Sequence, residues 1–217
     1  MKIRTAEMLC DRVAQDLSWR KKELTALRDL ITLPSVSVPR KRVVSRSGIT
    51  LLYAHWEGFV KKASLYYLEF VRMQRLKNFE LAPNFVSLIM CQQMGRSQNS
   101  KKPSQYEWII DFFTNQQEDR AVFAYKDAVD TESNLSARVF KEIMWTLGLD
   151  YSFFEPLEKL IDATLLGKRN AVAHGENEPV DQFDYLFLHD RVIEMMNFFK
   201  NQLENAAVTG AYKRCIV

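Results

Sequence analysis

The sequence predicts an all-α fold, because its apolar residues recur at helical spacing and its helix-breaking residues are few. Only seven Gly and six Pro are scattered along the 217 residues, and no low-complexity tract or fixed-period repeat is present. At 47% hydrophobic, the chain can bury a substantial core. We therefore expect one domain over residues 1–217, with its core at about 20–206, the first part of the leading helix at 1–19 and a tail at 207–217.

Two long amphipathic helices are expected in the first third of the chain. Apolar residues at three- and four-residue spacing predict a helix over residues 6–32, which stops before Pro34. The stretch from Pro34 to Pro39 has the composition of a linker, and from Ser47 a broad apolar stripe predicts a central core helix. Between them lies a basic cluster: Arg40, Lys41, Arg42 and Arg46. We interpret this cluster as a solvated run of charge in preference to a phosphate-binding patch.

Shorter helices and an irregular segment are expected in the middle of the chain. Pro83 opens one helical stretch, and the apolar group from Trp108 to Phe113 marks another. Residues 114–134 are polar and broken, apart from an alternation at 122–125 that could form a small hairpin. This segment is the best candidate for an insertion or a lid.

Capping residues mark the last helices. The polar run at 131–134 is expected to cap a helix that Gly148 ends. Pro156 suits the first turn of the next helix, which runs toward Arg169. Asp181 is expected to cap the final helix, whose alternating three- and four-residue apolar spacing indicates a helix-pairing seam.

Charge and cysteine usage exclude several classes of protein. The formal charge of +3 is small, so any contact with nucleic acid must come from local patches. Cys10, Cys91 and Cys215 form no CxxC pair, which argues against a disulfide framework and against a cysteine zinc site. No signal-peptide core or membrane-length apolar run is evident. We expect a cytoplasmic protein with no membrane partner, no metal and no cofactor.

The candidate site is the hexapeptide from Arg169 through Asn170 to His174. Arginine binds phosphate oxygens through a forked, permanently charged donor set, and histidine moves protons near neutrality, so the pair suggests chemistry on a phosphodiester. The spacing alone is common, and a charged helix end is the plainer interpretation. At about 100° per residue, Arg169 lies roughly 140° around the helix from His174. One helix cannot focus both side chains on one atom, whereas two copies related by a two-fold axis could.

The hexapeptide and several ordered motifs resemble the HEPN superfamily (higher eukaryotes and prokaryotes nucleotide-binding), whose hallmark is an arginine followed four to six residues later by a histidine. More specifically, they resemble a stand-alone bacterial HEPN family of predicted ribonucleases. The resemblance extends over residues from about 20 to 206. The motifs that carry it are Leu51–Phe59, Leu81–Phe85, Thr131–Leu135, Leu165–Glu176 and His189-Asp190.

The resemblance implies a bundle of about four helices with additional helices, a homodimer, and a metal-independent endoribonuclease with Arg169 and His174 as its catalytic pair. Asn170 matches the polar position that often follows the arginine. RNA carries its own 2′-hydroxyl nucleophile, so His174 needs only to act as base or acid while Arg169 stabilises the phosphorane. HEPN toxins that are silenced by nucleotide transfer usually carry a tyrosine two positions after the histidine. Glu176 stands there instead, and that control is not expected.

Several further residues are weaker candidates for substrate contact. Glu57 could orient Arg169 or shape the groove, but it could equally be a surface or paired carboxylate. His55 on the same helix, and Lys168 before the motif, also have ordinary structural interpretations. Thr131, Glu132 and Asn134 could bind substrate, although capping explains them, and His189 is more commonly a packed or exposed histidine.

Two functions are consistent with these motifs. The first is an endoribonuclease of a toxin or anti-phage defence type, controlled by an antitoxin or another partner. The second is a non-catalytic HEPN module that binds RNA, a nucleotide or a partner protein. A third possibility is a structural helical bundle with no site, in which the basic residues and His174 would have no functional role.

Overall fold

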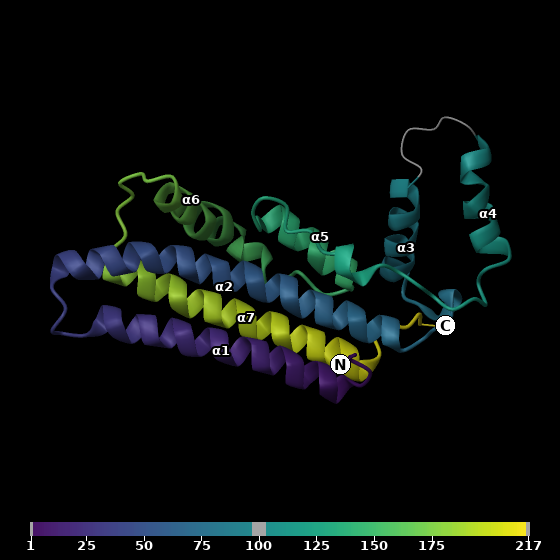
Figure 1. Ribbon diagram of the computed structural model, residues 1–217, viewed down its shortest axis with the longest axis horizontal. Helices are drawn as coiled ribbons and strands as arrows, with labels where there is room; N and C mark the ends of the chain where they lie inside the picture. Colours follow the sequence, from purple (N-terminus) through teal and green to yellow (C-terminus); the bar gives the residue numbers. More distant parts are fainter. Residues whose placement is uncertain (1, 97–102, 216–217) are drawn as a thin grey trace.

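The computed structural model describes residues 2–96 and 103–215 (Figure 1). Within these ranges the chain forms seven α-helices and no β-strand, which confirms the all-α prediction. The helices are α1 (Ala6–Thr32), α2 (Val38–Met73), α3 (Pro83–Arg96), α4 (Glu107–Thr114), α5 (Ala137–Leu147), α6 (Gly167–Ala173) and α7 (Gln182–Thr209). Shorter segments are the 3₁₀ turns η1 (Asn78–Glu80), η2 (Pro103–Tyr106), η3 (Tyr125–Asp127) and η4 (Glu155–Leu157), and the π-helical η5 (Leu160–Leu166).

Three long helices form the centre of the molecule. Helices α2 and α7 run in the same direction and α1 runs in the opposite one (Figure 1). Their apolar stripes meet in one core, in which the ring centroids of Phe59 and Phe199 lie 6.2 Å apart. Helix α2 also contacts α5 and α6. The η5–α6 rod packs on α2 as a fourth member, so a core of about four helices with additional helices is confirmed.

The start of α2 differs from the prediction. The first helix has the predicted limits, and Thr5 caps it by accepting a hydrogen bond from the Met8 N–H. Helix α2 begins at Val38 and not at Ser47, because Pro39 occupies the first turn, where its fixed φ and missing N–H are favourable. The linker is therefore limited to residues 33–37, and the basic cluster lies on the first turns of α2.

The segment at 114–134 is irregular, as predicted, but it contains no hairpin. Residues 122–125 lead into the 3₁₀ turn η3. The side chain of Gln92 holds the segment to α3 by accepting from the Ala124 N–H and donating to the Ala124 carbonyl, at 2.8 and 2.9 Å. Phe123 is buried, with its ring centroid 6.3 Å from that of Phe85. Because Phe123 is buried in this way, the segment packs against the core.

The N-terminal cap of α5 also differs from the prediction. Ser136, not the run at 131–134, caps the helix by accepting a hydrogen bond from the Val139 N–H. The Ala137 N–H donates to the carboxylate of Asp162 at 2.7 Å, so a second side chain satisfies the helix start. Gly148 ends the helix with a φ of 70°, as predicted. Residues 131–134 are left available for other contacts.

The last two predicted elements are confirmed. Pro156 lies in η4, and the chain then continues through η5 into α6. Asp181 caps α7 together with Asp184 in a reciprocal capping box. After α7 the chain stays packed, since Tyr212 is buried with its ring centroid 5.4 Å from that of Phe70.

Candidate functional site

Arg169 is held by side chains from three parts of the chain. Its guanidinium lies over the ring of Tyr53 on α2, 4.7 Å from the ring centroid. Its Nη1 donates to Oδ1 of Asn134, in the loop before α5, at 2.7 Å. The same nitrogen donates to Oδ1 of Asn170 at 2.6 Å. Within the described ranges Nη2 and Nε make no hydrogen bond, so part of the phosphate-binding fork is unused.

The ring beneath the arginine is itself fixed. Tyr53 is buried, and its hydroxyl accepts a hydrogen bond from the Leu135 N–H at 2.6 Å. Burial raises the pKa of Tyr53 to about 12, and the neighbouring carboxylate of Glu57 acts in the same direction. The phenol therefore stays neutral and offers its electron-rich face to the cation. Glu57 lies one turn after Tyr53 and acts on its hydroxyl. Among the described residues no ion pair joins Glu57 to Arg169, so any influence of Glu57 on the arginine is indirect.

His174 ends α6 and is exposed. Gly175 follows with a φ of 79°, a conformation that favours glycine. The Glu176 N–H donates to the Ala171 carbonyl and the Gly175 N–H to the Val172 carbonyl, at 2.9 and 3.1 Å, which is the Schellman pattern. The imidazole makes no hydrogen bond to any residue the structure describes. It is therefore free to meet a ligand from solvent.

Two basic residues fix the turn that carries His174. Arg46 on α2 donates from Nη2 to the Glu176 carbonyl and from Nη1 to the Glu178 carbonyl, at 2.7 and 2.8 Å. Lys168 pairs with the carboxylates of Glu178 and Asp184, both at 3.4 Å. Both side chains thus tie the 174–181 loop to the helices around it. Arg46 therefore has a structural task and does not belong to a solvated run of charge, and Lys168 is engaged within the chain.

The structure does not bring His55 to this cluster. Although it lies two residues from Tyr53, it faces α1, where its Nε2 is 2.8 Å from the carboxylate of Glu23. Burial lowers the pKa of His55, and Glu23 partly opposes this shift. His189 is likewise buried, beside Asp190 at 2.9 Å. Of the weaker candidates, only Glu57 lies on the face of α2 that meets Arg169.

Two residues of this arrangement are not assigned to the site by sequence pattern: Tyr53 belongs to the apolar stripe of α2, and Arg46 has the character of a surface charge. Asn134 is a possible substrate contact in the sequence, with capping as the plainer interpretation, and in the structure it holds Arg169. Tyr53 and Asn134 both lie within motifs that carry the family resemblance. Those motifs were the available signal for them.

An all-α bundle in which one helix carries Arg169 in its first turn and ends at His174 is the arrangement that the HEPN resemblance implies. The chain belongs to the RiboL-PSP-HEPN family, whose model matches residues 15–205. This match confirms the predicted superfamily. Neither the search of the curated proteins nor the search of the solved structures found a match.

The described ranges hold neither a membrane-spanning helix nor a metal-binding cluster. No helix there has the length and apolar character needed to span a bilayer. No group of three His, Cys, Asp or Glu side chains there is arranged to hold a metal ion.

Proposed function

We propose that this HEPN protein is a metal-independent endoribonuclease. The observation that supports it best is the state of Arg169: two amide oxygens and an aromatic face hold the guanidinium, yet Nη2 and Nε bond to none of the described residues. The α6 helix that carries it ends in an exposed histidine. A preorganised phosphate donor and an unpartnered proton-transfer group are what cleavage of RNA through its own 2′-hydroxyl requires.

The chemistry needs two proton transfers and one charge stabiliser. A base removes the proton from the 2′-hydroxyl, whose oxygen attacks the adjacent phosphorus. The bond from phosphorus to the 5′-oxygen breaks, and an acid protonates that oxygen. The products are a 2′,3′-cyclic phosphate and a 5′-hydroxyl. In this proposal Arg169 binds the phosphorane oxygens, His174 performs one proton transfer, and Asn170 and Asn134 position the guanidinium.

The proposal includes a homodimer, in which a second copy contributes its own Arg169 and His174 to one groove. An exposed apolar patch lies beside the 174–181 loop and suits such an interface. It comprises Val38, Phe183 and Phe187, whose exposed fractions are 80%, 78% and 53%. Large apolar side chains exposed together are typical of interaction surfaces. The proposal also places the protein in the cytoplasm, in a toxin or anti-phage defence role under the control of an antitoxin or another partner.

The second candidate function is a non-catalytic module that binds RNA, a nucleotide or a partner protein through the same groove. The unused donors of Arg169 favour it equally, because they would hold a phosphate whether or not cleavage follows. The two candidates differ only in whether His174 transfers a proton.

The deciding experiment is incubation of total RNA and tRNA with the purified protein in EDTA, followed by end-group analysis. His174→Ala is compared with Glu176→Ala, an exposed neighbour whose backbone alone takes part in the turn. We expect cleavage with 2′,3′-cyclic phosphate ends by the wild type and by Glu176→Ala, and loss of about 10²-fold or more in His174→Ala. Folded dimers that bind RNA without cutting it, in all three proteins, would establish the binding module instead.

A further inference from the structure

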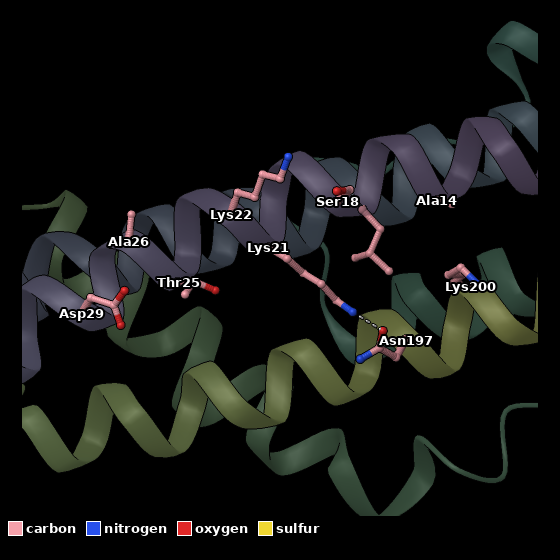
Figure 2. Close-up of a pocket in the computed structure, with 10 residues that line it drawn as sticks. Ala14, Ser18, Lys21, Lys22, Thr25, Ala26, Asp29, Asn197 and Lys200 are labelled. Carbon is pink, nitrogen blue, oxygen red and sulfur yellow. Dashed lines mark hydrogen bonds between the residues drawn. The ribbon is translucent and has the colours of Figure 1, made fainter.

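A groove of about 690 Å³ runs between α1 and α7 (Figure 2). Helix α6 lies on the other side of α2 from α1 (Figure 1). Lys21 and Lys22 of α1 line the groove, and Lys200 approaches from α7 (Figure 2). Its apolar lining comes from Ala14, Leu17 and Ala26. The groove is separate from the Arg169 cluster, since α6 packs on α2.

The groove carries positive charge that the chain only partly neutralises. Lys21 donates to the neutral amide oxygen of Asn197 at 2.6 Å and pairs with no carboxylate in the described ranges. Burial, and secondly the neighbouring charge of Lys200, lower the pKa of Lys21. Lys200 pairs with Glu204, whereas Lys22 is exposed and has no hydrogen bond or ion pair to a described residue. A negatively charged ligand would offset the electrostatic repulsion between the ammonium groups of Lys21 and Lys200.

The lining favours a protein helix over a nucleic acid. Proteins that bind single-stranded RNA place aromatic or arginine side chains under the bases, and the lining of this groove contains neither. Lys21 crosses from α1 toward Asn197 of α7, and Ala14, Leu17 and Ala26 line the groove along α1 on either side of it (Figure 2). A groove between two helices that combines apolar and basic side chains is the form of site into which an amphipathic helix of opposite charge docks. From Ala14 to Asp29 the groove follows α1 for about 22 Å, since a helix rises about 1.5 Å per residue. About four turns of a docked helix would fit alongside.

We propose that the α1–α7 groove binds an acidic amphipathic helix of a partner protein. The apolar face of that helix would rest on the exposed side chains of Ala14 and Ala26, with the buried Leu17 at the floor of the groove. Its Asp or Glu residues would face Lys21, Lys22 and Lys200. This docking surface stands independently of the ribonuclease proposal, because it lies on another face of the bundle and requires no RNA chemistry.

The test uses a display library of peptides of about 16 residues, patterned as amphipathic helices with randomised charge. The wild-type protein is the bait, and binders are then measured against Lys21→Glu/Lys22→Glu/Lys200→Glu. The matched control is Lys61→Glu/Lys126→Glu/Lys159→Glu, which reverses three exposed lysines outside the groove. We expect enrichment of Asp- and Glu-rich helices whose affinity falls about tenfold or more on reversal in the groove and is unchanged in the control. Enrichment without acidic residues, or equal binding to both variants, overturns the proposal.

Two further measurements keep the result unambiguous. If the triple reversal unfolds, Lys22→Glu alone replaces it, because that side chain is exposed and bonds to none of the described residues. A fluorescent single-stranded RNA of about 20 nucleotides tests whether the groove binds nucleic acid instead of an acidic helix. Each protein variant is titrated into this RNA in EDTA. Equal RNA affinity in the two triple variants supports the protein helix. Selective loss of RNA binding in the groove variant would identify a nucleic-acid site and overturn the proposal, whatever the outcome of the cleavage assay.

Discussion

The two faces of α2 carry similar residues and use them differently. Toward α6, the buried ring of Tyr53 lies under Arg169 and beside the carboxylate of Glu57. Toward α1, the buried ring of His55 lies beside Arg20, and Glu23 is 2.8 Å away. Each face therefore combines an aromatic ring, an arginine and a carboxylate. The arginine of the first face is half-buried and that of the second is buried, and we refer to them as the open face and the sealed face of α2.

The arginines differ in how many of their donors are used. Arg20 is 8% exposed, and it donates from Nε to Asp16 at 2.7 Å and from Nη1 to the His55 carbonyl at 3.3 Å. Gly58 makes room for it, because a Cβ there would lie 2.8 Å from Nη1. Arg169 is half-buried, and among the residues the structure describes it donates hydrogen bonds only from Nη1. A buried cation that is satisfied within the chain holds two helices together, whereas a fixed cation with spare donors is available to a ligand.

The largest effect is expected from removing the open arginine. Arg169→Ala should lower RNA cleavage by about 10²–10³-fold, because a preorganised donor at the phosphorane is lost. Its free energy of unfolding should change by about 1 kcal/mol or less, since the side chain is only half-buried. Single-turnover cleavage and urea unfolding measure the two quantities.

Arg72→Ala is the matched control for that experiment. Arg72 lies at the C-terminal end of α2 and is half-buried, with its guanidinium 5.6 Å from the ring centroid of Tyr125. We expect it to retain full cleavage. Equal loss of cleavage in both variants would show that Arg169 acts through general stability, and the distinction between the two faces of α2 would fail.

The next largest effect is expected on stability, at the sealed face. Arg20→Met should lower the free energy of unfolding by about 3 kcal/mol, because it leaves Asp16 with 11% of its side chain exposed and without its cation. Cleavage per folded molecule should be unchanged. Urea midpoints measure the loss, and Arg20→Met/Asp16→Asn should recover part of it, since removing both charges removes the unpaired one. A loss of cleavage per folded molecule in Arg20→Met would contradict this prediction, because it would show that the α1-facing side of α2 takes part in the site.

Local pattern was sufficient to predict much of the fold. The limits of α1, the cap of α7 and the end of α5 at Gly148 each depend on residues within a few positions of one another. The start of α2 was misplaced because proline serves both to end a linker and to open a helix. The cap of α5 was misplaced because Ser, Thr and Asn suit several adjacent positions equally.

The site was only partly predictable, because its supporting contacts are distant in sequence. The hexapeptide indicates Arg169 and His174, but Asn134 lies 35 residues from Arg169 and is joined to it only by the packing of the α5 loop against α6. Burial of Tyr53 follows from its place on the stripe, whereas the cation above its ring does not. The sequence does show that His55 and Glu57 could not both meet the same site, since residues two positions apart on a helix lie about 200° apart around its axis.

The smallest effect is expected in the pH dependence of stability, and it tests the sealed face of α2. Burial lowers the pKa of His55 below its ordinary value of 6.5, with Glu23 acting in opposition. As the pH falls below 6.5, the unfolded chain therefore takes up a proton before the folded one, and the folded state loses stability. His55→Gln removes this uptake, so the loss between about pH 7.5 and about pH 5 should be smaller than in the wild type. Urea midpoints at the two pH values measure it, and other titrating groups cancel in the comparison. Parallel curves for the wild type and His55→Gln would show that His55 is not titrating against its burial between α1 and α2.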